Sequence, residues 1–321
     1  MKLKDLMPEI LTLYWKYGDA IHHIGPDFIK ARPLGRKEGH SEWVGRQAVQ
    51  VVREMGPPSA HVSEGAIVLV VPDAHAAPKQ DLRRFRWLGN AIQHYGKIAI
   101  AKCVPFRVVW IGDTADYHSL SSYDRGRAAS WNSLYVADVE SHRAAMAATR
   151  KQVSDEVWNY ADKHWTEGNH EHRAVRYMQD NPELQGVLEG PWDVMQSFDI
   201  QCHDYTKIVT LDGIGYCHVM QNPGTGRPVG GVNQARTMLL KGFRSMVVGH
   251  SHRYDSYTQN DLYGNPIKTL VVGCYFEHNE GYAGQGNNAW WRGLVVLENA
   301  KDGNFDETPL RMETVKAKFG G

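Results

Sequence analysis

The sequence predicts an α/β fold whose main domain follows a short N-terminal segment. Two apolar runs, residues 66–71 (AIVLVV) and 106–111 (FRVVWI), are typical of strands that are covered on both faces. Between them, residues 79–95 carry apolar side chains at helical spacing. Strand, helix and strand in this order form a βαβ unit, which joins two parallel strands of one sheet.

Length and composition limit the class of protein. A chain of 321 residues can bury a substantial core in one large domain. Its 36 Lys and Arg balance its 36 Asp and Glu, so any attraction to nucleic acid or acidic lipid must be local. Its 4 Cys form no CxxC pair, which predicts a reduced, cytoplasmic protein. Acidic residues interrupt residues 1–13 and no apolar run reaches membrane-spanning length, so neither a signal peptide nor a membrane partner is expected.

The N-terminal segment, residues 1–60, is expected to be helical. Residues 8–17 and 41–54 predict two short helices, and their arrangement around a Gly-containing stretch resembles a helix-turn-helix module that would bind DNA. A helical cap on the main domain is an equally good interpretation. The Pro-Pro-Ser sequence at 57–59 is typical of a linker, so the main domain is expected to span residues 61–321.

Further elements are expected along the main domain. Residues 135–163 predict a helix, because apolar side chains recur at every seventh position. Residues 207–217 predict two paired strands around an Asp-Gly turn, and residues 243–248 predict another strand. Apolar runs at 269–272 and 294–297 predict strands that complete a second sheet.

Potential metal ligands stand just after the predicted strands. The oxygen and nitrogen donors in these positions are Asp73, His75, Asp113, Asn169, His218, His250 and His252. In open α/β sheets, ligands bind outside the carboxyl ends of the strands, so these side chains are expected to share one pocket. Seven donors are too many for one zinc ion and suit two cations. Because the set contains no thiolate, it favours Mn²⁺, with Fe or Zn²⁺ as alternatives.

The order of these donors resembles the motif blocks of the calcineurin-like metallophosphoesterases. The chain has Asp-x-His at 73–75, Gly-Asp-x-x-Asp at 112–116, Gly-Asn-His-Glu at 168–171, a lone His218 and Gly-His-x-His at 249–252. Any single block arises easily by chance, but five in order, each after a predicted strand, favour the family. More narrowly, the chain resembles members encoded by tailed bacteriophages, which often carry a short helical segment ahead of the catalytic domain.

The resemblance implies a fold and a division of the ligands. The fold would be a four-layer αββα sandwich of two mixed sheets flanked by helices, with a small N-terminal helical segment. Each metal would have three ligands of its own: Asp73, His75 and His252 for the first, and Asn169, His218 and His250 for the second. Asp113 would bridge the two metals, because each of its oxygens can take a cation.

The resemblance also implies a mechanism. The two cations, roughly 3.5–4 Å apart, would lower the pKa of a bridging water, and the resulting hydroxide would attack the phosphorus of a phosphoester. His170 would bind no metal and would face the leaving-group oxygen as a general acid or charge stabiliser. Asp116 would orient the imidazole of His170.

One position departs from the protein phosphatases of this superfamily. Those enzymes place an Arg that holds the substrate phosphate where this chain has Tyr117, so protein dephosphorylation is not favoured. Other arginines could hold the phosphate, although a surface Arg is usually only a solvated charge; the candidates are Arg125, Arg127, Arg173 and Arg227. The sequence therefore does not identify the residues that bind the substrate. The insert at residues 117–163 is expected to form a lid over the metals.

The sequence is compatible with three functions. A metal-dependent hydrolase of a nucleic-acid phosphodiester or end phosphate is favoured, because of the possible helix-turn-helix module and the phage resemblance. A phage-encoded protein would act in the host cytoplasm. The first alternative is a phosphatase or phosphodiesterase for a nucleotide, a cyclic nucleotide or another small phosphate. The second is a non-catalytic, metal-containing scaffold that binds DNA, but His170 and Asp116 would be surplus in a scaffold.

Two adjacent tryptophans, Trp290 and Trp291, have two interpretations. They could stack on a nucleobase, but a tryptophan pair before an apolar strand more often belongs to the core.

Overall fold

The computed structural model describes residues 65–121, 134–184, 186–279 and 281–321, together with three short strands nearer the N-terminus. Those strands form a small antiparallel sheet: β1 (Ile21–Ile24), β2 (Ile29–Ala31) and β3 (Glu42–Val44). β3 lies inside the range 41–54, so the helix predicted there does not extend over these residues. An aromatic and a β-branched residue, Trp43 and Val44, favour the strand. The helix predicted at residues 8–17, and with it the helix-turn-helix module, lies outside the described residues.

The larger sheet has six strands in the order β14-β13-β4-β5-β6-β7. Four of them run parallel: β4 (Ala66–Val71), β5 (Phe106–Trp110), β6 (Asp162–Thr166) and β7 (Gln201–His203). The other two pair antiparallel beside β4: β13 (Gly293–Lys301) and β14 (Asn304–Arg311). The predicted βαβ unit is therefore confirmed, with β4 at the predicted bounds.

The smaller sheet has five strands in the order β11-β12-β10-β9-β8. They are β8 (Val209–Leu211), β9 (Ile214–Tyr216), β10 (Met246–Val248), β11 (Tyr254–Asn260) and β12 (Pro266–Val272). β9, β10 and β12 run parallel, while β8 and β11 are antiparallel to their neighbours. The hairpin predicted at 207–217 is confirmed as β8 and β9.

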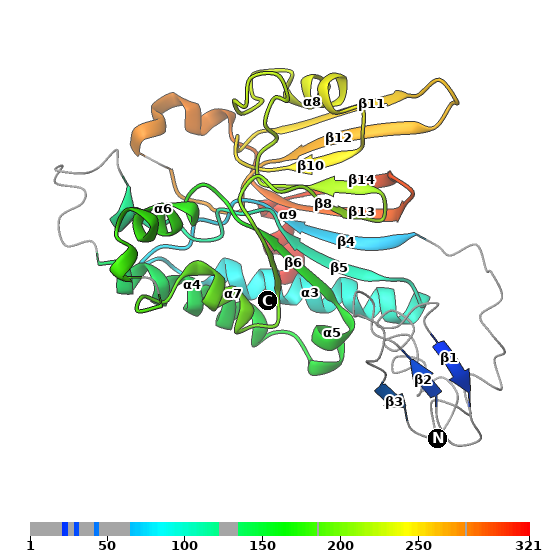
Figure 1. Ribbon diagram of the computed structural model, residues 1–321, viewed down its shortest axis with the longest axis horizontal. Coiled ribbons are helices and arrows are strands. Elements are labelled where there is room, and N and C mark those ends of the chain that lie inside the picture. Colours follow the sequence, from blue (N-terminus) through cyan, green and yellow to red (C-terminus); the bar gives the residue numbers. More distant parts are fainter. Residues whose placement is uncertain are drawn as a thin grey trace.

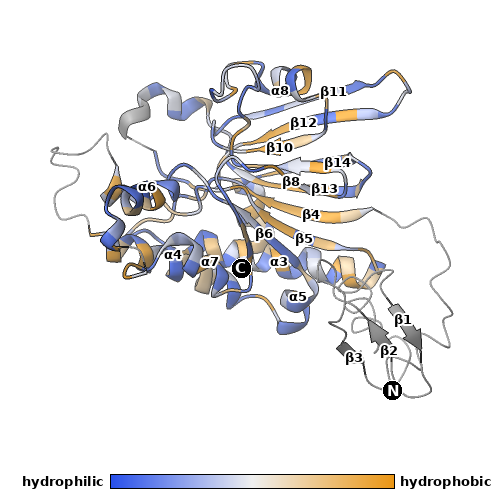
Figure 2. Cartoon of the chain, in the orientation of Figure 1, coloured by the Kyte–Doolittle hydropathy of each residue, from blue (hydrophilic) through white to orange (hydrophobic). Residues whose placement is uncertain are grey.

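Alternating side chains of β4 explain why the two sheets and the helices form layers. Ile67, Leu69 and Val71 belong to an apolar cluster that the larger sheet shares with helices. Val68 and Val70 point the other way, into a cluster that includes residues of both sheets. Figure 2 shows hydrophobic residues along β4, β5 and β10. The larger sheet is thus buried on both faces, which accounts for its uninterrupted apolar runs.

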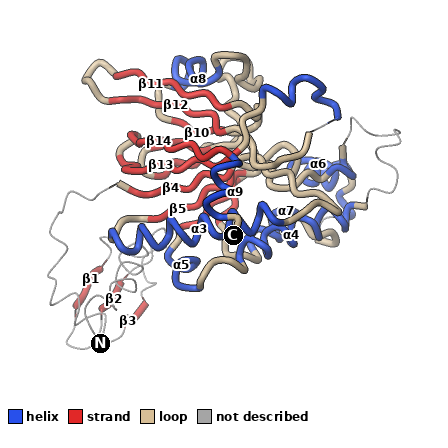
Figure 3. The backbone as a smooth tube through the Cα atoms, turned by 180° about the vertical axis from the view of Figure 1, so that it is seen from behind, coloured by secondary structure: helices blue, strands red, loops and turns tan. Residues whose placement is uncertain are grey.

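Helices cover the outer face of each sheet. On the larger sheet these are α3 (Arg83–Lys102), α4 (Tyr135–Arg150), α5 (Asp155–Tyr160), α7 (Pro191–Gln196) and α9 (Met312–Phe319). On the smaller sheet α8 (Gln234–Gly242) packs against β11 and β12. Figure 1 shows α8 on one side and α3, α4 and α7 on the other, with the strands between them, and Figure 3 shows α9 near α3. The protein is therefore α/β with two mixed sheets flanked by helices, an arrangement compatible with the predicted sandwich.

Two predictions of secondary structure need correction. The run at 294–297 lies in β13 of the larger sheet and does not complete the smaller one, because it pairs with β4. The helix predicted at 135–163 ends at Arg150. A second helix then begins after Ser154, whose hydroxyl accepts a hydrogen bond from the Val157 amide as an N-cap. The last residues of the predicted range belong to β6, which pairs with β5.

The insert at residues 117–163 does not contribute a lid from its helices. α4 packs against α3 in the outer helical layer, and its Val139 and Met146 are buried in the core cluster. Residues 122–133 of the insert lie outside the described residues. Within the described ranges, no helix is both long and apolar enough to cross a membrane.

Candidate metal centre

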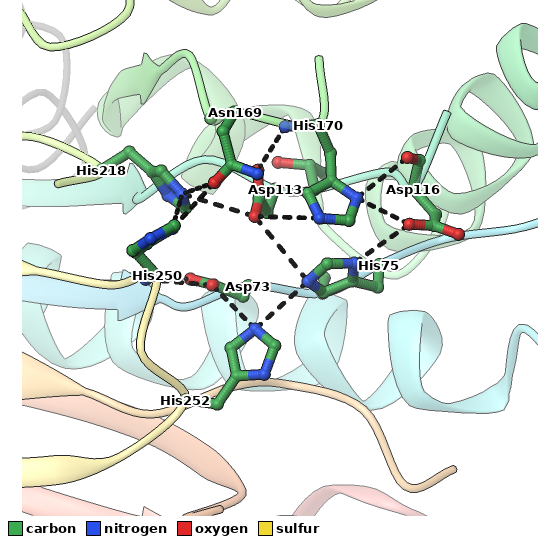
Figure 4. A network of polar contacts seen from close by, with 12 residues as sticks. Asp73, His75, Asp113, Asp116, Asn169, His170, His218, His250 and His252 are labelled. Carbon is green, nitrogen blue, oxygen red and sulfur yellow. Dashed lines mark hydrogen bonds and ion pairs between the residues drawn. The ribbon is translucent and has the colours of Figure 1, made fainter. Parts of the chain in front are cut away.

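The predicted ligands lie together at the carboxyl ends of strands from both sheets (Figure 4). In the larger sheet, Asp73 follows β4, Asp113 follows β5 and Asn169 follows β6. In the smaller sheet, His218 follows β9 and His250 follows β10. The loops are joined by backbone hydrogen bonds, including one of 2.9 Å from the Ala74 amide to the Asp113 carbonyl and one of 3.0 Å from the Gly249 amide to the His218 carbonyl. The two sheets therefore build one cluster of potential ligands.

The loop backbones are strained where they present ligands. His75, Asp113, His250 and His252 all have left-handed conformations, with φ of 46°, 47°, 70° and 56°. Such conformations are uncommon outside Gly and cost about 1–3 kcal/mol each, so they persist only where the surrounding structure enforces them. A β-carbon at Gly249 would lie 2.3 Å from Asp73 Oδ1, which explains a Gly ahead of His250.

The first group of ligands consists of Asp73, His75 and His252. Nε2 of His252 lies 3.1 Å from Asp73 Oδ2 and 3.3 Å from Nε2 of His75. All three side chains are buried. These three residues offer ligand atoms within 4.8 Å of one another, a spacing that could hold a metal ion.

The second group consists of Asn169, His218 and His250. Asn169 Oδ1 lies 2.9 Å from His218 Nε2 and 2.8 Å from His250 Nδ1, and the two ring nitrogens are 3.2 Å apart. The other ring nitrogen of His218, Nδ1, donates a hydrogen bond of 2.7 Å to the Ile111 carbonyl. This bond fixes the ring and directs Nε2 of His218 towards the other ligands, where it could bind a metal ion once it has lost its proton.

Asp113 lies between the two groups. Its Oδ2 is 3.3 Å from His218 Nε2, 3.8 Å from His75 Nε2 and 3.8 Å from His170 Nε2. Its Oδ1 accepts a hydrogen bond of 2.9 Å from the His170 amide. Asp113 also completes two further groups that could hold a metal ion, one with His75 and His170 and one with His218 and His250.

The donor set suits cations better than hydrogen bonding alone. The carboxylates of Asp73 and Asp113 and the Oδ1 atom of Asn169 can only accept, and at most one proton fits between the facing Nε2 atoms of His75 and His252. Several acceptor atoms therefore face one another at this buried site. Divalent cations would satisfy them, and oxygen and nitrogen donors without a thiolate suit Mn²⁺, Fe or Zn²⁺.

The charges in the pocket are strongly coupled. Burial alone would raise the pKa of Asp113, but the imidazoles of His218 and His170 outweigh burial and hold that pKa well below its ordinary value. Burial likewise opposes the charged form of His218, but the Asp113 carboxylate raises the pKa of His218 to about 10. With a pKa this high, a proton on His218 supplies positive charge beside the Asp113 carboxylate. Metal ions would therefore compete with protons for the same atoms.

His170 and Asp116 lie beside the two groups, as predicted. Nδ1 of His170 is 2.6 Å from Asp116 Oδ1 and 3.0 Å from the Asp116 carbonyl oxygen. Asp116 Oδ1 is also 3.5 Å from His75 Nδ1. Burial would raise the pKa of Asp116, but hydrogen bonds from His170 and His75 lower it, so this carboxyl group is ionised. Asp116 thus fixes the orientation of His170.

Of the four arginines considered for the phosphate, one lies at this site. Arg173 donates a hydrogen bond of 2.9 Å to the Asp116 carbonyl, and its Nη2 lies 3.3 Å from Nε2 of His170. Arg227 is exposed in a loop, and Arg125 and Arg127 lie outside the described residues. Tyr117 is fully buried, with its hydroxyl 3.0 Å from His142 Nδ1, so its hydroxyl faces the core.

Sequence reasoning missed two residues that brace the ligand loops. The Glu171 carboxylate is buried and accepts hydrogen bonds from four backbone amides, those of Asp113, Thr114, Ala115 and Gly168. Burial and the nearby Asp113 charge raise the pKa of Glu171 to about 8. Its place as the last residue of the Gly-Asn-His-Glu block was the available signal.

The second missed residue is Arg84 of α3. Its buried guanidinium donates to the carbonyl oxygens of Ala74, His75 and Asp81, at 3.0, 3.4 and 3.1 Å. This places a fixed positive charge against the loop that carries Asp73 and His75. An Arg within an amphipathic helix gives no sequence signal of such a role, because most helical Arg side chains are solvated.

Four further histidines stand near the motif blocks in the sequence, and the structure divides them into two pairs. His118 Nδ1 lies 3.8 Å from Asp116 Oδ2, and His278 stacks on Phe276, whose ring is 5.2 Å from that of His75. The other two bond elsewhere, His164 to His203 and Asp162, and His172 to Glu167.

Comparison with known proteins identifies no matching family model and no matching curated protein. The motif blocks and the arrangement of their side chains are thus the features that indicate a function.

Proposed function

We propose that the protein is a calcineurin-like phosphoester hydrolase that uses two divalent metal ions, with Mn²⁺ favoured. Asp113 carries this proposal, because its Oδ2 lies within 3.8 Å of ring nitrogens from both ligand groups. A carboxylate in contact with both groups is what a shared ligand requires. When bound, two cations would lower the pKa of a water and neutralise charge on the phosphoryl oxygens.

The pair His170 and Asp116 would handle the proton of the leaving group. Because the Asp116 carboxylate accepts the Nδ1 proton of His170, Nε2 is the nitrogen that faces the ligand groups. Nε2 would give its proton to the departing oxygen or stabilise the charge that develops there. A scaffold that only bound metal would have no use for an oriented imidazole at this place.

Arg173 would hold the substrate phosphate. Its guanidinium lies against His170 and is mostly buried. Within the described residues it has no hydrogen bond to a carboxylate, because Asp116 Oδ1 is 3.9 Å from its Nη1. A guanidinium can bind two phosphate oxygens at once. Arg173 would thus replace the Arg that protein phosphatases carry at the position of Tyr117.

The favoured substrate is a phosphodiester of a nucleic acid, or its end phosphate, and a small phosphate such as a nucleotide is the alternative. The discriminating test is hydrolysis of bis-p-nitrophenyl phosphate and of p-nitrophenyl phosphate with added Mn²⁺. We expect hydrolysis of the diester to exceed that of the monoester and to stop with a chelator. Hydrolysis of neither compound with Mn²⁺, Fe²⁺ or Zn²⁺ would refute the proposal and favour a scaffold.

The same assay tests the bridging ligand. Asp113→Asn should lose metal and activity together, because an amide cannot offer two anionic oxygens to two cations. Asp306→Asn, at an exposed position of β14, is the matched control and should retain both. Two full equivalents of metal in Asp113→Asn, measured by elemental analysis, would count against the bridge.

A further inference from the structure

An aromatic wall borders the first ligand group. Phe276 is fully buried, and its ring lies 5.2 Å from that of His75 and 5.3 Å from that of His252. Trp290 extends this wall: its ring lies 4.7 Å from His252 and 5.5 Å from Phe276, nearly perpendicular to both. The wall therefore touches two predicted metal ligands directly.

The two adjacent tryptophans have different surroundings. Trp291 is held by the fold, because its ring packs 5.0 Å from Tyr254 and its amide donates a 2.8 Å hydrogen bond to the His252 carbonyl. Both tryptophans are partly buried, but Trp291 packs against the apolar cluster between the two sheets, whereas the ring of Trp290 packs against His252 and Phe276 beside the predicted ligands. Trp291 thus fixes the backbone, and the indole of Trp290 stays accessible beside the metal ligands.

The surroundings of Trp290 also suit an anionic ligand. The guanidinium carbon of Arg292 lies 5.9 Å from the centre of the Trp290 ring. The same guanidinium donates hydrogen bonds to the His278 carbonyl and to Asn279 Oδ1, at 3.2 and 2.8 Å, which hold it in place. Aromatic faces next to a cation are what single-stranded nucleic acids and nucleotides bind, by stacking of a base and attraction of a phosphate.

The position of the wall identifies the part of the substrate that it would bind. The ring of His75 lies between the two sides of the site, 4.5 Å from His170 and 5.2 Å from His252. In the proposed reaction the leaving group would depart on the His170 side. Trp290 lies beyond His252 and thus borders the substituent that stays on the phosphorus.

We propose that Trp290 forms a stacking subsite for the nucleobase of a nucleoside that remains attached to the phosphate after hydrolysis. This inference rests on the proposed function and narrows its substrate to nucleotide phosphodiesters. In the reaction, water adds to phosphorus, the bond from phosphorus to the leaving oxygen breaks, and that oxygen takes a proton. The product on Trp290 is a nucleoside monophosphate.

Two esters with the same leaving group test the subsite. Thymidine 5′-(p-nitrophenyl phosphate) carries a base, and methyl p-nitrophenyl phosphate does not. With Mn²⁺, Trp290→Ala should lower the ratio of kcat/KM for the thymidine ester to that for the methyl ester by about 5- to 150-fold, the range that base stacking on an aromatic residue provides. Trp290→Phe should restore most of the ratio. Tyr263→Ala, at an exposed aromatic position on the hairpin of β11 and β12, is the control and should not change it.

Two results would overturn the subsite. An unchanged ratio in Trp290→Ala would show that the base does not stack there. An equal loss on both esters, together with loss of metal, would show that Trp290 only supports His252. If the wild-type protein hydrolyses neither ester, the proposed function fails, and binding of thymidine 5′-monophosphate by equilibrium dialysis decides the subsite separately. Equal Kd values for wild type and Trp290→Ala would then refute it.

Discussion

Replacing Arg173 by Ala removes the guanidinium beside His170 and should weaken substrate binding. The side chain makes one hydrogen bond to the protein backbone, at the Asp116 carbonyl, and its Nη2 lies 3.3 Å from His170 Nε2. It is therefore already held where the phosphate would lie. The substitution leaves both ligand groups intact, so metal content should not change.

The expected magnitude follows from the lost phosphate contact. A hydrogen bond to a charged group contributes about 1.5–3 kcal/mol, which corresponds to a factor of roughly 10–150 in kcat/KM. Because the guanidinium would bind the phosphate before and during the reaction, most of the loss should appear in KM. Arg173→Lys should recover only part of the lost kcat/KM, since an ammonium cannot make the two parallel hydrogen bonds of a guanidinium.

The assay is steady-state hydrolysis of bis-p-nitrophenyl phosphate with Mn²⁺, together with inhibition by inorganic phosphate. The inhibition constant should rise by the same factor as KM. Arg176→Ala is the control, because Arg176 is exposed one turn further along α6 (His172–Asp180). If Arg173→Ala leaves both KM and phosphate inhibition unchanged, Arg173 does not hold the phosphate.

Three more predictions follow from the site and the core. His170→Ala should keep both metals but lose a factor on the order of 10²–10³ in turnover, so unchanged turnover would remove His170 from the mechanism. His252→Ala and His250→Ala should each lose one metal, from the first and second ligand group respectively; elemental analysis would contradict this if either variant lost both or neither. Burial and the charge of Arg143 lower the pKa of His142 to about 3 in the folded state. The unfolded chain therefore takes up this proton first, and the free energy of unfolding falls as the pH drops below the ordinary pKa of 6.5. Between pH 8 and pH 5 His142 accounts for a drop of about 2 kcal/mol in the free energy of unfolding, at 1.36 kcal/mol per pKa unit. When the free energy is measured by urea unfolding at both pH values, the drop in His142→Gln should be smaller than in the wild type by that amount.

Much of the candidate site could be predicted from sequence, because most of the potential ligands closely follow apolar runs. The apolar composition of a strand that is buried on both faces predicts the strand, and the residues that follow it must lie at the carboxyl end of the sheet. Asp73 and Asp113 therefore needed only local information. The placement of Arg84 could not be predicted in this way, because a helical Arg that reaches back to carbonyl oxygens nine and ten residues earlier looks like a solvated one in sequence. That of Trp290 could not, because it comes to the site by packing of segments that are far apart in the chain. The wrong assignment of residues 294–297 has the same cause: an apolar run predicts a strand but not its neighbour.

His250 and His252 show how backbone conformation divides ligands that sequence places together. In an extended chain, side chains at positions i and i+2 point the same way and would approach one ion. Here both residues have a positive φ, so the chain turns between them. His250 Nδ1 then faces Asn169, and His252 Nε2 faces Asp73, at 2.8 and 3.1 Å. The strain at these residues is thus the structural reason why one short loop can supply both ligand groups.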